Sequence, residues 1–190
     1  MRPARASGSI SGMNIADLAR LIENIVRLGT IAEVQMQPPR VKVKSGTLTT
    51  TWLPWLALRA GADREWDPPT TGEQVVLLSP SGHLAQGLVL TGLFSDLIPA
   101  NGERAGLHRR TYRDGAVIEY DSIAHRLLAI LPAGGAAELQ APAGITILGD
   151  VDITGLVTVS NDVIAAGISL VNHRTKGVMP GSGISQEPTP

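Results

Sequence analysis

A single histidine near the end of the sequence, His173, has the side chain whose chemistry stands out most. It lies in the segment NHRTKGV, residues 172–178, between a β-like run and a tail that is rich in glycine and proline. The chain has no cysteine, so any metal site must use histidine, aspartate, glutamate or backbone oxygen atoms. Imidazole suits zinc, iron and nickel, and His173 is therefore a candidate metal ligand. The alternative is a metal-free segment that is held by packing of Val171, Val178 and the neighbouring glycines.

Three other polar residues contain the ingredients of a catalytic site. Ser81, His83 and Asp96 could form a nucleophilic triad, but no strained nucleophile elbow or oxyanion motif accompanies them. They therefore do not support hydrolase chemistry, and we expect a protein that is not an enzyme.

Several aspartates lie near glycines in the second half of the chain: Asp150, Asp152 and Asp162. Carboxylate oxygens bind calcium, but isolated aspartates in β-turns are usually solvated caps. We expect these three to be caps.

The three tryptophans, Trp52, Trp55 and Trp66, could form a platform on which sugar rings stack, since small β-barrels sometimes bind oligosaccharides. Their alternation with leucine and proline instead favours a role in the core and collar of a domain. A β-rich adhesin or carbohydrate-binding module is thus the alternative function that these residues leave open.

Charge and hydropathy argue against two classes of protein. The net charge is −1, charged residues make up 17% of the chain, and lysine and arginine are scattered, so we expect no nucleic-acid partner. No apolar run approaches the roughly 20 residues that span a bilayer, and the N-terminus lacks the apolar core of a secretory signal. We therefore expect a protein that is made in the cytoplasm and is not an integral membrane protein. Residues 1–12 are interpreted as a disordered arm or a remnant of cloning.

The first half of the sequence predicts one helix followed by a small barrel. Apolar residues at spacings of three and four form a stripe over residues 13–29, and Gly29 is predicted to cap this amphipathic helix. Short β-like runs between turn residues fill residues 30–98, which indicates five strands in a closed barrel of the oligonucleotide/oligosaccharide-binding (OB) type. Residues 99–115 are interpreted as a linker or neck. The stripe consists of Ile15, Leu18, Leu21, Ile22, Ile25 and Leu28.

The second half shows an alternating pattern. From Leu127 to Val159, every odd-numbered residue is apolar or glycine. Side chains of an extended strand alternate between two faces, so we expect one face of this long β region to be apolar. A lone chain would expose that face together with unpaired strand edges. We therefore expect residues 116–170 to form an intertwined, triple-stranded β-helix in a homotrimer; an ordinary β-sandwich half is the alternative.

The stretch TWLPWLALRAGADREWDPPTTGEQVVLLSPSGHLAQGLVLTGL, residues 51–93, resembles the OB-fold domain of the phage baseplate assembly protein V family. The WLPW pair, the RAG, the tryptophan before the prolines, the GEQV and the S-P-x-G-x-L spacing occur in the same order. Residues 151–170 resemble the β-helix repeats of that family, and the similarity extends over residues 13–183. Members of this family are the central spikes of contractile tails, in phages and in R-type pyocins.

The resemblance implies a mainly β protein with an N-terminal helix, an OB-fold collar, a trimeric triple-stranded β-helix and a pointed tip at residues 171–190. It implies a place in the baseplate of a virion or pyocin tail, where the trimer is bound to a hub protein. On sheath contraction the spike would pierce the outer membrane of the target bacterium, with no turnover. The apolar stripe of the helix would then be either the docking surface for the hub or a surface that packs on its own barrel or on symmetry mates.

Members of the family usually carry an H-x-H pair at the tip, before a G-V, and three chains then hold one iron ion on the threefold axis. In this sequence His173 keeps the first position and Thr175 takes the second. The resemblance thus implies one metal ion on the trimer axis, with iron as the expected metal. Only half of the usual histidine ligands would be present to hold it.

Overall fold

The computed structural model describes residues 14–174 and residue 181 of the chain. The chain divides after Ala136 into two units, which are treated separately below. The predicted arm at residues 1–12 and most of the predicted tip lie outside the described residues. The elements of the first unit are α1 (Ile15–Ile25), β1 (Val26–Gln35), β2 (Arg40–Ser45), β3 (Leu48–Thr49), β4 (Gln74–Leu78), the short 3-10 helices η1 (Pro80–Gly82) and η2 (Leu84–Gln86), β5 (Leu88–Leu93), β6 (Leu107–Thr111), β7 (Val117–Asp121) and β8 (Arg126–Ile130).

The N-terminal helix exists, but the prediction that it extends to Gly29 was wrong. α1 begins after Asn14, whose side chain accepts a hydrogen bond from the Ala16 N–H at 3.2 Å, and it ends at Ile25. Gly29 does not cap the helix because it lies inside β1, which pairs with β4 over Val26–Thr30. A Cβ atom on Gly29 would lie 2.5 Å from Val43 Cγ1, so the glycine permits β1 and β2 to approach closely.

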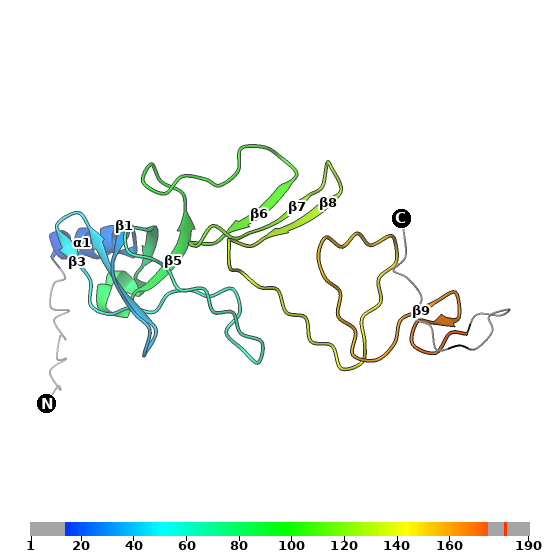
Figure 1. Ribbon diagram of the computed structural model, residues 1–190. Helices are drawn as coiled ribbons and strands as arrows, with labels where there is room; N and C mark the ends of the chain where they lie inside the picture. Colours follow the sequence, from blue (N-terminus) through cyan, green and yellow to red (C-terminus); the bar gives the residue numbers. More distant parts are fainter. Residues whose placement is uncertain (1–13, 175–180, 182–190) are drawn as a thin grey trace, which may run out of the picture. The chain divides into compact units, whose positions relative to one another are not determined.

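The barrel is built on a five-stranded antiparallel sheet in the order β3-β2-β1-β4-β5 (Figure 1). β1 is the long central strand. It pairs with β2 on one side and with β4 on the other, and its register with β2 shifts between Ile31 and Glu33. Such a bulge bends the strand, which a small closed barrel requires.

The segment that contains Leu53 and Trp55, which we call the closing segment, closes the sheet into a barrel. Leu53 exchanges two backbone hydrogen bonds with Val41 in β2, at 2.8 and 2.9 Å. Three residues on, the Leu56 N–H donates to the Val89 carbonyl in β5 at 2.8 Å. Pro54 has no N–H to donate, so the segment forms isolated bridges in place of a regular strand. The predicted OB-type barrel over residues 30–98 is confirmed in architecture, although its first strand starts at Val26.

The barrel core is entirely aliphatic. Its fully buried members come from β1, β2, the closing segment, β4 and β5, and Trp55 packs against them from the side. This agrees with the aromatic content of only 3%. The buried core residues are Ile31, Val41, Val43, Leu53, Val75, Leu77 and Val89.

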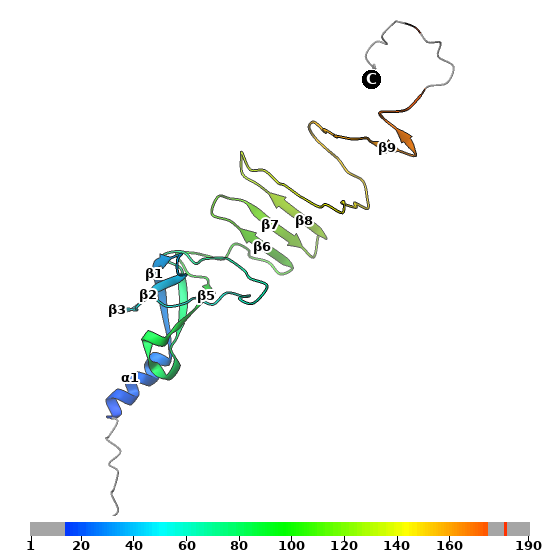
Figure 2. The same ribbon diagram turned by 90° about the horizontal axis from the view of Figure 1, so that it is seen from below.

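The predicted linker at residues 99–115 is partly a strand, so that boundary was wrong. β6 pairs antiparallel with β7, and β7 with β8, in a three-stranded meander that lies beside the barrel in both views (Figures 1 and 2). The β7–β8 turn contains His125 at φ 52°, and the β6–β7 turn contains Gly115 at φ 88°.

The second unit has little hydrogen-bonded structure of its own. Within its described part the strands are β9 (Ile164–Ala165) and β10 (Ile168–Ser169), which pair as a short hairpin. Residues 131–163 carry no strand within the single chain. Among the described residues, no helix has the length and apolar character that crossing a membrane requires.

Candidate functional site

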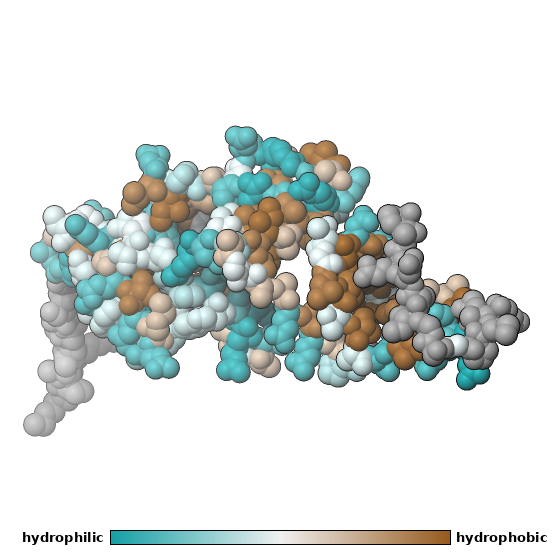
Figure 3. Space-filling view, in the orientation of Figure 1, coloured by the Kyte–Doolittle hydropathy of each residue, from teal (hydrophilic) through white to brown (hydrophobic). Residues whose placement is uncertain are grey.

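The large apolar residues of the odd register between Ile145 and Val159 form an extensive exposed surface in the described chain. We call this set the odd-register face. Its large side chains are 48% to 65% exposed, although most of them are β-branched residues that usually lie in cores. Figure 3 shows brown, hydrophobic side chains gathered over the stretch that is yellow to orange in Figure 1. The set comprises Ile145, Ile147, Val151, Ile153, Val157 and Val159.

The even-numbered neighbours of that face are mainly polar, as the alternation predicts. Asp150, Asp152 and Thr154 are exposed between the apolar residues. In β8 the pattern departs from the prediction, because Leu128 is the half-buried residue and Leu127 is 74% exposed. Leu128 pairs with Glu119 of β7, and it is the one residue of this strand that the single chain partly covers.

His173 lies in the turn that follows β10, and its side chain is exposed. Its Nδ1 atom is 2.9 Å from the Leu170 carbonyl oxygen. A carbonyl oxygen only accepts, so Nδ1 is the donor in this contact, and Nε2 is the ring nitrogen that the neutral imidazole would offer to a metal. Metal-binding histidines usually have this arrangement, with one ring nitrogen held by a backbone carbonyl and the other directed at the ion.

The described residues contain no group of three histidine, cysteine or acidic side chains that could hold a metal within one chain. His173 is thus a single potential ligand per chain. Thr175, which replaces the second histidine of the expected pair, lies outside the described residues.

Asp162 caps the β9–β10 hairpin, which agrees with the expectation that the aspartates are caps. Its Oδ1 atom accepts a hydrogen bond from the Val171 N–H at 3.2 Å. The Ser169 hydroxyl, together with nearby backbone N–H groups, holds the pKa of the Asp162 carboxyl below its usual value.

Ser81, His83 and Asp96 do not form a triad. Ser81 lies in η1 at φ 54° and His83 follows it, while Asp96 lies in an exposed loop after β5. No hydrogen bond joins them in the described part of the chain. The prediction against hydrolase chemistry at these residues still rests on the absence of a motif.

The apolar stripe of α1 is mostly exposed. α1 packs on η1 through Leu21 and the buried Asn24, whose side chain accepts a hydrogen bond from Arg27 Nη1 at 2.8 Å. The remaining stripe residues of the helix, Ile15, Leu18, Ile22 and Ile25, are all exposed, whereas Leu28 of the predicted stripe lies in β1. The helix therefore packs on its own barrel by one edge only.

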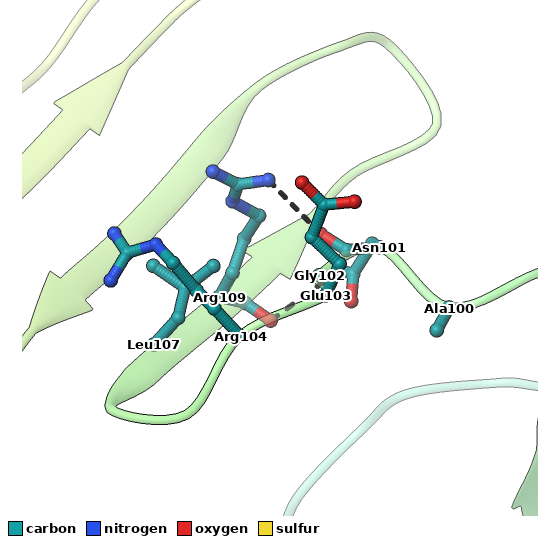
Figure 4. A pocket seen from close by; sticks show the side chains of 7 residues that line it. All are labelled: Ala100, Asn101, Gly102, Glu103, Arg104, Leu107 and Arg109. Atoms are coloured by element: carbon teal, nitrogen blue, oxygen red, sulfur yellow. Dashed lines mark hydrogen bonds between the residues drawn. The ribbon is translucent and has the colours of Figure 1, made fainter.

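The β6–β8 meander and the segment that precedes it, which we call the neck, contain a network of ion pairs that the sequence did not predict. Arg109 on β6 donates from Nε to the buried Glu119 on β7 at 2.6 Å. Its Nη1 atom donates to the Asn101 carbonyl at 3.0 Å, and Asn101 Nδ2 donates back to the Arg109 carbonyl (Figure 4). The clue in the sequence is E-Y-D at residues 119–121, since residues two apart on a strand share one face.

Asp121 is the most strongly perturbed group of this network. Arg104 donates a short hydrogen bond to its Oδ2 atom, while Oδ1 accepts from the N–H groups of Ile123 and Ala124 at 2.9 and 3.0 Å. The hydrogen bond from Arg104 is the largest cause that lowers the pKa of Asp121, and the turn N–H groups lower it further. Asp121 thus closes the β7–β8 turn and attaches residues 101–104 to it.

Asp121→Asn should remove part of the acid sensitivity of the neck. Because the folded-state pKa lies below the unfolded value, the carboxylate stabilises the fold above the unfolded pKa of about 4 and loses that contribution as the pH falls below it. We expect the wild-type protein to lose thermal stability between pH 5 and 3 more steeply than Asp121→Asn does. Melting curves across this range test it, with Asp63→Asn at a highly exposed side chain as the control. Parallel curves for Asp121→Asn and wild type would contradict the assignment.

The arginine that follows in β6 attaches the neck to the barrel. Arg110 Nη2 lies 2.7 Å from Asp67 Oδ2, and its Nη1 lies 3.9 Å from Glu65 Oε1. These carboxylates belong to the loop that follows the closing segment, so the meander and the barrel are joined by charge as well as by the chain.

The tryptophans fall into two groups. Trp55 packs against the barrel core, as predicted, and its ring centroid is 5.9 Å from that of Trp66. Trp66 itself is 62% exposed, so its predicted place in the core was wrong. Trp52 lies apart from this pair, beneath the Lys42 ammonium at 4.6 Å from the ring centroid.

Comparison with known proteins matches this architecture. Residues 27–94, the barrel, match the family model for the type VI secretion system/phage-baseplate injector OB domain. The spike protein of Escherichia phage P2 is 41% identical over 108 residues, which are 57% of this chain and 51% of that protein. The barrel of this chain is thus similar to the OB domain of phage-baseplate injectors. The matched region spans about half the length of the P2 relative. In this chain the OB domain is followed by the β6–β8 meander and the second unit.

Proposed function

We propose that this chain forms a homotrimeric central spike at the end of a contractile tail tube. In this proposal it lies in the baseplate of a virion or pyocin tail and pierces the outer membrane of a target bacterium when the sheath contracts. It acts mechanically and not as an enzyme. The similarity to a phage spike protein supports the location, and the odd-register face supports the assembly.

The observation that carries the proposal is the odd-register face without a partner in its own chain. Residues 131–163 expose apolar side chains, most of them in the odd register, with Leu148 and Leu156 as exposed exceptions in the even register, and they form no strand pairs within the described chain. The apolar side chains would be buried and the backbone would be paired if the same segment of two further copies wound around this one. Strands from different chains would then supply the missing hydrogen bonds. The small and β-branched residues of the face would fill the narrow shared axis. Bending such a shaft breaks several inter-chain hydrogen bonds at once, which provides the stiffness that a puncturing device needs.

Light scattering after size-exclusion chromatography tests the assembly directly. A mass of three times the 19.9 kDa chain is expected at micromolar concentration, and it should persist on dilution. A monomeric mass would overturn the proposal. Variants of the tip that still form the assembly then test the function. Particles that carry them should have normal tails and lose killing or infectivity.

The exposed stripe of α1 is the surface that we assign to the tail hub. The helix meets its own barrel at Leu21, at the buried Asn24 and at the Ile25 carbonyl, which accepts from the Ser79 N–H, and the exposed side chains of the stripe remain available for a partner. An amphipathic helix that places apolar residues at spacings of three and four suits a hydrophobic groove on that partner.

The described geometry fits a metal ion at His173 in part. One imidazole per chain, with Nδ1 held by Leu170 and Nε2 free, would give three equivalent nitrogen ligands in a trimer. When bound, an ion at this position would cross-link the three chains. Iron is the metal that we expect here. Three imidazoles also suit zinc and nickel.

Elemental analysis of the purified protein should therefore find one metal ion per trimer. His173→Ala should reduce this content to background because it removes every imidazole of the site. Thr175→His should raise the occupancy by supplying a second nitrogen per chain. Wild-type protein without stoichiometric metal, or an unchanged content in His173→Ala, would show that the tip is held by packing alone.

A further inference from the structure

A cavity of about 420 Å³ opens on the OB domain beside Trp55 and Trp66. Their rings are tilted by 55° with respect to each other, so they line the cavity as two inclined walls. Trp55 is fixed because it packs on the core and forms a backbone bridge with Val89. Trp66 exposes most of its ring although no part of the barrel core requires it to do so. Pockets of roughly 300–1,000 Å³ with aromatic walls are typical of small-molecule sites.

The rim of the same cavity is positively charged. Three arginines line it, Arg40, Arg59 and Arg64, against the single carboxylate of Glu65. Glu65 lies 3.9 Å from Arg110, which offsets its charge. Asp63 comes within 3.9 Å of Arg59 but is 90% exposed, so this pair is weak. The chain as a whole carries a net charge of −1, which makes this local excess of guanidinium groups distinctive.

These two features define the chemistry of a ligand. The C–H groups on the flat face of a sugar ring are slightly positive and pack well on the negative face of an indole. A guanidinium group forms two parallel hydrogen bonds with a carboxylate or phosphate group. A ligand that satisfies both features has an apolar ring face and an anionic substituent.

We propose that this cavity binds a saccharide unit that carries a carboxylate or phosphate group. The site lies on the OB domain, and it goes beyond the mechanical role proposed above because it would let the collar bind an acidic surface polysaccharide. Single-stranded nucleic acid also stacks on aromatic rings, but it needs a positive groove that follows its backbone. The arginines here surround one compact cavity, which favours a short acidic sugar.

Calorimetric titration of the full chain with a galacturonic acid trisaccharide tests the proposal, with the neutral galactose trisaccharide as the matched probe. The acidic probe should bind at least about tenfold more tightly, and the difference should shrink at high salt. Trp66→Ala should weaken binding by roughly five- to 100-fold, the range of losses found when an aromatic stacking partner is removed. Arg64→Gln should reduce the preference for the acidic probe. Trp52→Ala is the control and should leave binding unchanged, since Trp52 does not line the cavity.

Several results would overturn the assignment. Absence of binding, equal affinity for the two probes, or equal losses in Trp66→Ala and Trp52→Ala would each do so. Tighter binding of an oligothymidylate that is lost in Trp66→Ala would assign the cavity to nucleic acid instead. A change in the mass of the assembly in Trp66→Ala would make the cavity a contact between copies. Circular dichroism shows whether each variant is folded, and a folded Trp66→Ala with unchanged affinity decides against the site.

Discussion

Ile153→Asp is expected to abolish the trimer while leaving the single-chain fold intact. Ile153 belongs to the odd-register face and is 62% exposed in the chain, so an aspartate there meets water in a monomer. In the proposed trimer the same position places three carboxylates on one narrow apolar axis. Burying an ion without a partner costs several kcal/mol, and like charges at close range add repulsion. The mass in solution should fall to that of one chain, with the circular dichroism of the OB domain retained.

Thr154→Asp is the matched control for this substitution. It introduces the same charge one residue further on, in the even register, where the neighbouring polar residues are exposed. In an alternating strand that position faces solvent, so the trimer should persist. Loss of the trimer in both variants would show only a general effect of charge. A stable trimer in Ile153→Asp would contradict the packing of the odd-register face at an axis.

The barrel was predictable because its sequence obeys local rules. Runs of alternating residues, separated by turn residues, predicted five strands. The pairs β1–β2, β2–β3 and β4–β5 follow from short antiparallel connections, whereas the pairing of β4 with β1 spans the long segment 50–73 and does not follow from local rules. The end of the helix was not predictable in the same way. Gly29 has the residue type of a helix cap, but pairing of Val26–Thr30 with β4 outweighs that local preference. The glycine is needed there for a contact with Val43, which only the folded barrel contains.

The strand β6 was missed for a different physical reason. Its sequence, LHRRT, lacks the apolar alternation by which strands are usually recognised. The face that it covers is filled by Arg109 against Glu119 in place of an aliphatic pair. A polar pair of this kind leaves no hydropathy signal, although opposite charges on facing strands stabilise a sheet. His173 and the odd-register face were recognised from sequence, and only in the proposed trimer would other copies of the chain cover them.

Gly82→Ala is expected to detach α1 from the barrel. Gly82 is buried at the end of η1 with φ +74°, and an added Cβ would overlap the carbonyl oxygen and Cα of Leu21 in the helix. The overlapped atoms are backbone, so no side-chain rotation relieves the clash and the helix must move. Left-handed strain of about 1–2 kcal/mol adds to an overpacking cost of about 1–3 kcal/mol, which predicts a loss of roughly 2–5 kcal/mol. Amide hydrogen exchange within α1 should accelerate far more than exchange in β1 and β4.

Gly46→Ala separates the two contributions. Gly46 also has a positive φ, +62°, but nothing lies within 4 Å of its would-be Cβ, so this variant carries the left-handed strain alone. It should cost about 1–2 kcal/mol and leave exchange in α1 unchanged. The difference between the two variants measures how firmly Leu21 and Asn24 hold the helix on η1. Equal behaviour would show that α1 is not held there, and the exposed stripe would then lack the fixed orientation that docking to a hub requires.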